Sequence, residues 1–154
     1  MNILRSDSEA NIHQLSASLI DARNLYEMVA EFPELETVRE TIDDIVSERS
    51  RHIKGLKQCL LDMGQLPSDG NDDSATALGF GARLETAISE DPLKSTVARC
   101  IATENGLLEL ARNSLEDLDE TGIREELKDI ENHVKKTLDR LNRLAERNSG
   151  QDTD

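Results

Sequence analysis

The sequence predicts an all-α fold, a four-helix bundle of two antiparallel helical hairpins joined by a long crossover with a short extra helix. Three observations support this prediction. Aromatic residues make up only 2% of the 154 residues, while charged residues reach 32% and residues that favour helices dominate the middle of the chain. Four segments carry apolar residues at alternating three- and four-residue spacing. The connections are short within each half of the chain and long between the halves, and the length suits one domain with one core.

The first helix is predicted over about 7–31. Ser6-Asp7-Ser8-Glu9 fits a capping box, in which hydroxyl and carboxylate oxygens accept hydrogen bonds from free N–H groups at a helix start. Phe32-Pro33 ends the helix, because proline disfavours helical geometry in the residue before it. The residues expected to face the core are Ile12, Leu15, Leu19, Ala22, Tyr26 and Val29.

The second helix is predicted over about 34–63, and two polar residues, Arg49 and His52, interrupt its apolar seam. A polar, turn-rich segment follows at 64–74, and 75–88 could form a short helix weakened by glycine. Together they make the crossover, 64–91. The seam of the second helix is Leu35, Val38, Ile42, Ile45, Arg49, His52, Leu56, Cys59 and Met63.

The third helix is predicted over about 92–118, since Asp91-Pro92 combines an N-cap with proline at the first helical position. After a tight turn at 119–122, the fourth helix is predicted over about 123–147. The domain is therefore 1–147, and 148–154 is expected to be a disordered tail. The third seam is Val97, Ile101, Glu104, Leu108, Ala111, Leu115 and Leu118; the fourth is Ile123, Leu127, Ile130, Val134, Leu141 and Leu144, with His133 at its edge.

Polar residues on these seams resemble part of a dimetal centre. Carboxylate-bridged dimetal bundles take one Glu from each of two helices and a Glu-x-x-His pair from each of the other two. When the two halves of the chain are aligned, Glu104 takes the position equivalent to Ala22, and His133 takes the position equivalent to His52. The residues three before the histidines are Arg49 and Ile130, where the scheme requires glutamate. One carboxylate cannot balance two hard cations beside a guanidinium, so dimetal chemistry is disfavoured.

Two interpretations of this core remain open. In the first, Arg49 and Glu104 form a buried ion pair, with His52 and His133 supplying hydrogen bonds, so that the four make a core polar cluster. In the second, a single zinc or iron ion binds His52, Glu104 and His133. Three further carboxylates, Glu48, Asp129 and Asp21, lie at or outside the seam by helical phase and are expected to be solvated, although the first two could add ligands.

The two hairpins also resemble a known family. With the runs LIDARNLYEMVAEFPELETVRETIDDIVSERSRHIKGL and RCIATENGLLELARNSLEDLDETGIREELKDIENHVKKTLDRL, the chain resembles the ferritin-like superfamily, and within it the bacterial four-helix family called domain of unknown function 2383. The resemblance covers about residues 10–147 and rests on helix lengths, the hairpin repeat and the linker after MGQLP. It implies a ferritin-like bundle and brings no established activity.

Charge and composition exclude several functions. A net charge of −14 opposes binding to nucleic acid and to anionic membranes, which rests on basic residues. No signal peptide or apolar run of membrane-spanning length is present, so a cytoplasmic protein is expected. Cys59 and Cys100 are expected to be reduced, buried thiols. No catalytic residue is predicted.

Three function classes follow. The first is a non-enzymatic interaction or stress-associated bundle that self-associates as a homo-oligomer, most simply a dimer, needs no cofactor and can bind a protein partner. The second is a metal protein with the reduced His/Glu ligand set. The third is a histidine phosphotransfer module at His52, whose following Ile-Lys-Gly is one residue out of register with such modules.

Overall fold

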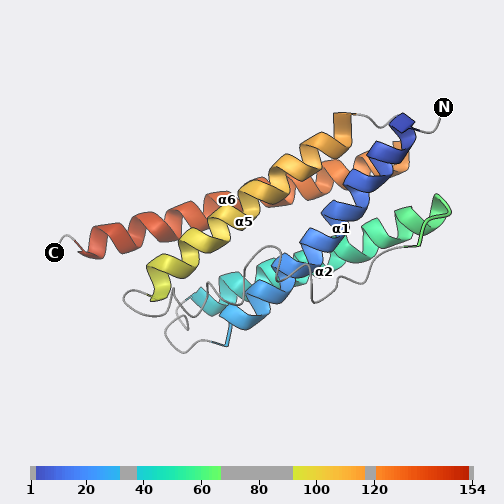
Figure 1. Cartoon of the computed structure of the whole chain (residues 1–154). Coiled ribbons are helices and arrows are strands. Elements are labelled where there is room, and N and C mark those ends of the chain that lie inside the picture. The colour runs from blue at the N-terminus through green and yellow to red at the C-terminus, as the bar shows by residue number, and fades with distance from the viewer. Residues whose placement is uncertain (1–2, 32–37, 67–91, 117–120, 153–154) are drawn as a thin grey trace.

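The computed structural model describes residues 3–31, 38–66, 92–116 and 121–152, which form four α-helices and no strand (Figure 1). The all-α, four-helix prediction is confirmed for this part of the chain. The predicted crossover helix at 75–88 and all but the first residues of the crossover lie outside the described residues. The helices are α1 (Ile3–Val29), α2 (Arg39–Asp62), α5 (Pro92–Glu116) and α6 (Thr121–Asp152).

The four helices pack as a ring around one core. The main packing pairs are α1 with α2, α2 with α6, α6 with α5, and α5 with α1. Helices α2 and α5 are therefore not neighbours in the ring but lie across the core from each other. Figure 1 shows α1 and α2 running in opposite directions, as do α5 and α6, whereas α2 and α5 run in the same direction.

In each hairpin, an arginine near the start of the second helix donates a hydrogen bond to a backbone carbonyl near the end of the first. Near the start of α2, Arg39 donates from Nε and one Nη to the carbonyl oxygen of Ala30, at 3.0 and 2.7 Å, just past the end of α1. Near the start of α6, Arg124 donates to the carbonyl oxygen of Leu115 in the last turn of α5, at 3.2 Å. Cationic donors suit these ends, because the last carbonyls of a helix lack partners and carry partial negative charge.

Helix α2 ends just before Gly64, the first residue of the predicted turn-rich segment. Gly64 has a φ of 79°, in the left-handed region that glycine adopts without steric cost. The Gln65 amide donates to the Leu60 carbonyl at 2.8 Å, and the Gly64 amide donates to the Leu61 carbonyl at 3.0 Å. These two bonds form a Schellman motif, which satisfies the carbonyls at the helix end.

The core confirms the seams of α1, α2 and α6 more fully than that of α5. All six predicted α1 residues are buried. In α5, however, Cys100 and Leu107 are buried, while Ile101 and Leu108 are only partly so. The α5 face is thus turned slightly from the predicted one. Adjacent apolar pairs such as Leu107-Leu108 satisfy either helical phase, so periodicity alone could not choose between them.

Three helix ends differ from the prediction. Helix α1 starts at Ile3, so Ser6 lies inside it and does not cap its start; no helix breaker precedes Ser6. Thr121 and Gly122, predicted in a turn, begin α6. That helix continues to Asp152, so most of the predicted disordered tail has helical backbone, because extending an existing helix is far easier than starting one. The predicted start of α2 at 34–37 and the end of the third helix at 117–118 lie outside the described residues.

Asp21 is another correction. It was expected to be solvated but is buried, with only 4% of its surface exposed. The reason is that α1 is buried over a wider arc than one seam, since Ile20 and Leu25 beside it are buried too. Burial raises the pKa of the Asp21 carboxyl above its usual value.

Candidate functional site

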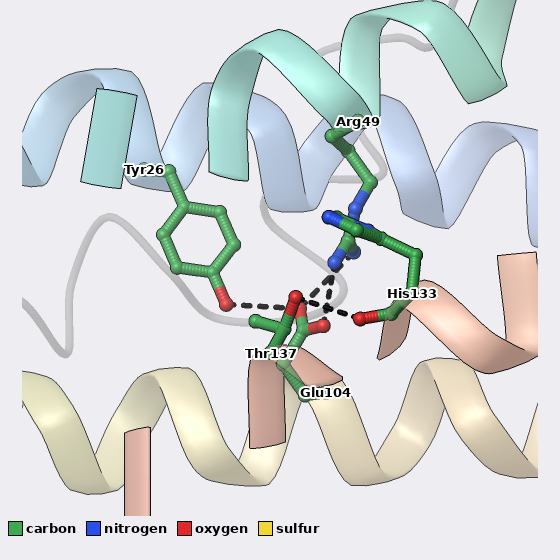
Figure 2. Close-up of polar contacts among 5 residues, drawn as sticks. All are labelled: Tyr26, Arg49, Glu104, His133 and Thr137. Atoms are coloured by element: carbon green, nitrogen blue, oxygen red, sulfur yellow. Dashed lines mark hydrogen bonds and ion pairs between the residues drawn. The ribbon is translucent and has the colours of Figure 1, made fainter. Parts of the chain in front are cut away.

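A buried ion pair spans the centre of the bundle. Arg49 on α2 donates from its two terminal nitrogens to the two carboxylate oxygens of Glu104 on α5, at 2.6 and 3.1 Å (Figure 2). Both side chains are fully buried, at 0% exposed. The pair therefore joins the two helices that face each other across the core. This two-pronged geometry matches a planar guanidinium to a planar carboxylate and is the strongest form of such a contact.

Tyr26 on α1 completes the site, and sequence reasoning missed it. Its hydroxyl donates to Glu104 Oε2 at 2.9 Å, so one carboxylate takes hydrogen bonds from two other helices (Figure 2). Burial and the negative charge of Glu104 hold the Tyr26 pKa well above its usual value, which keeps the hydroxyl protonated as a donor. Tyr26 could have been identified from the sequence, because a tyrosine on a buried seam needs a hydrogen-bond partner for its hydroxyl.

Electrostatics favour the charged form of the pair. Burial alone would lower the pKa of Arg49, but the charge of Glu104 and its hydrogen bonds outweigh burial, and the pKa is raised. The guanidinium thus stays positive inside the core. Removing either partner would leave the other charge buried without compensation, which costs several kcal/mol.

The two histidines lie beside the pair without bonding to it. His52 is 5% exposed and His133 is half-buried, and their ring centroids are 5.1 Å apart at an interplanar angle of 59°. The Nδ1 of each ring is buried without a hydrogen-bond partner. In the described residues no hydrogen bond joins either imidazole to Arg49 or Glu104. The neutral donor to Glu104 is the Tyr26 hydroxyl.

Burial and nearby positive charge keep both imidazoles neutral. Burial lowers the pKa of His52, with Arg51 and Arg49 adding to the effect. Burial, Arg49 and His52 together lower the pKa of His133 to about 3. Figure 2 shows that the polar contact of His133 is made by its backbone, whose carbonyl oxygen accepts from the Thr137 hydroxyl at 2.9 Å.

The remaining candidate ligands do not converge on the histidines. Asp129 is exposed, as expected. Glu48 is partly exposed and accepts a hydrogen bond from Arg51 at 2.6 Å, which lowers the pKa of its carboxyl. Ala22 and Ile130, at the positions where the dimetal scheme has glutamate, are buried. Across the described ranges no group of three or more His, Cys, Asp or Glu side chains is placed to hold a metal ion.

Two further features bear on function. Both cysteines are free thiols; Cys100 is buried, which raises its pKa to about 12, whereas Cys59 is only partly buried. Among the helices that the structure describes, none has an apolar stretch long enough to cross a membrane.

No protein-family model, curated protein or solved structure matches the chain.

The low pKa of His133 predicts acid sensitivity. The unfolded chain binds a proton at His133 near pH 6.5, whereas the folded protein does so only near pH 3. The unfolded state thus binds more protons between these values, so stability falls as the pH drops from about 6.5 towards 3, by at most about 1.4 kcal/mol per pH unit. In urea unfolding at about pH 7 and pH 5, His133→Asn is expected to lose less stability than the wild type. An equal loss in both proteins would contradict the assignment.

Proposed function

We propose that the protein is a non-enzymatic helical bundle of ferritin-like architecture that acts by binding other proteins. In it a buried salt bridge occupies the place where dimetal helical bundles hold their ions. The observation that carries this proposal is the two-pronged Arg49–Glu104 contact with both side chains fully buried. A guanidinium in the centre neutralises the carboxylate that a metal would need, and it cannot lose its proton to make room for a cation.

The arrangement of the helices supports the ferritin-like part of the proposal. Because α2 and α5 run in the same direction, the end of α2 and the start of α5 lie at opposite ends of the bundle (Figure 1). Ferritin-like folds join two hairpins of this kind by one long crossover. The repeated arginine contact at the two turns also fits a pair of equivalent hairpins.

The alternatives lack support of this kind. A phosphotransfer histidine must be reachable from solvent, and His52 is buried. A single zinc or iron ion on His52, Glu104 and His133 would have to displace Arg49 from Glu104, and both oxygens of that carboxylate already accept hydrogen bonds. Neutral imidazoles can bind metal, and the metal content of the protein distinguishes this alternative from the proposal.

The metal content of the purified protein tests the proposal against the single-ion alternative. Protein purified without chelator, then dialysed with zinc or ferrous iron and again without, is expected to retain far less than one ion per chain, and EDTA is expected to leave its melting temperature unchanged. Elemental analysis and thermal unfolding measure the two quantities. Retention of one ion per chain, lost in His52→Ala, would overturn the proposal in favour of a metal protein.

Self-association and an acidic surface complete the proposal. A chain of net charge −14 suits a basic partner, since opposite surface potentials steer association. The proposal includes a cytoplasmic location, which suits two free thiols. It also includes a homodimer, and light scattering on the metal-analysis sample should give twice the mass of one chain. A monomer would remove self-association from the proposal.

A further inference from the structure

A groove of about 620 Å³ is lined by residues of α2 and α6. Ser47, Glu48 and Arg51 of α2 line one wall, and His133, Lys136 and Arg140 of α6 line the other. His133 therefore belongs both to the surroundings of the buried site and to an opening at the surface. The role proposed for the buried ion pair does not involve this opening.

The groove carries a small excess of positive charge on an acidic protein. Four cationic side chains line it, against three carboxylates, in a chain with a net charge of −14. Two of the cations are neutralised locally: Arg51 pairs with Glu48 at 2.6 Å, and Arg143 pairs with Asp139 at 3.6 Å. Within the described ranges, Lys136 and Arg140 have no carboxylate within ion-pair distance, and the third lining carboxylate, Asp44, has no cation within that distance. Lys136 and Arg140 are therefore the two free cations of the groove, against one free carboxylate.

The spacing along α6 places three donors together. His133, Lys136 and Arg140 stand at positions i, i+3 and i+7, which share one face of a helix, and all three line the groove. The Nδ1 of His133 is buried and has no acceptor, which favours the tautomer that carries its proton on Nε2. His133 then carries an N–H donor on the same helix face as the Lys136 ammonium and the Arg140 guanidinium.

From this geometry we infer that the groove is a binding site for a small oxyanion of the phosphate class. Lys136 and Arg140 supply the opposing charge, and the Nε2–H of His133 donates to a third oxygen. A tetrahedral anion with several oxygens can accept from three donors at once, which a single carboxylate does less well. The phosphate site does not depend on the proposal that the core holds no metal, so an experiment can reject one of the two proposals without rejecting the other.

Titration with inorganic phosphate tests the inference. In low-salt buffer at about pH 7.5, amide NMR shifts near Lys136 and Arg140 are expected to change and saturate, with pyrophosphate binding more tightly and acetate more weakly. The double variant Lys136→Gln/Arg140→Gln is expected to weaken phosphate binding about tenfold or more, because it removes two charge-assisted hydrogen bonds. Both residues are exposed, so the fold should be preserved.

The matched control is Lys54→Gln/Lys128→Gln, which removes the same charge from exposed positions outside the groove lining. It is expected to bind phosphate within about twofold of the wild type, since screened surface charges act weakly over such distances. An equal loss in both double variants, or shifts that never saturate, would show that phosphate only screens surface charge. Acetate binding as tightly as phosphate would overturn the ligand class.

Discussion

Replacing Arg49 by methionine is expected to lower the free energy of unfolding by about 3–5 kcal/mol. Methionine fills a similar volume, but the carboxylate of Glu104 is then left in the core with only Tyr26 as a donor. The loss arises from an uncompensated buried charge rather than from a cavity. Urea or thermal unfolding measured by circular dichroism gives the difference directly.

Arg51→Met is the control for this prediction. Arg51 lies two residues further along α2 and also pairs with a glutamate, Glu48, but its side chain is 71% exposed. Exposed pairs contribute little, so the expected change is below about 1 kcal/mol. If the Arg49 variant lost no more stability than the Arg51 variant, compensation of the Glu104 charge by Arg49 would not contribute to the free energy of unfolding as predicted.

Tyr26→Phe is expected to cost about 1–3 kcal/mol, because it removes a donor to a buried, charged acceptor while leaving the ring in place. Tyr26 is the only tyrosine, and there is no tryptophan, so near-ultraviolet absorbance reports its ionisation without interference. Since its folded pKa is raised, the native protein should resist ionisation above pH 10, and its stability should fall as the pH rises beyond that value.

Thr103→Val serves as the control for Tyr26. The Thr103 hydroxyl donates to the Arg99 carbonyl within its own helix, so its removal breaks a local bond and leaves no buried charge unpaired. A loss in Tyr26→Phe no greater than in this control, or normal tyrosine ionisation in the native state, would rule out the strong bond to Glu104.

Much of the core followed from the sequence because long amphipathic helices have an unambiguous period. The α1 seam is one example, where Leu15, Leu19 and Tyr26 stand at strict helical spacing and are all buried. The ion pair was also predictable. One positive and one negative residue each interrupted an apolar seam, and burial of either charge requires the other.

Other features depended on three-dimensional context that periodicity does not contain. Tyr26 was counted as an apolar seam residue because a pattern registers its ring and not its hydroxyl. Asp21 was expected in solvent because a single-seam view underestimates how much of α1 is buried. The groove could not be predicted, because Arg51 and Arg140 are brought to one surface only by the packing of α2 against α6.

The most direct test of the account is the unfolding free energy of the double variant Arg49→Met/Glu104→Met, measured beside the two single variants. If the charges are tolerated only because they compensate each other, each single variant loses about 3–5 kcal/mol, while the double variant lies near the wild type or above it. A double variant that loses the sum of the two single losses would show that Arg49 and Glu104 act independently, and would contradict the central claim.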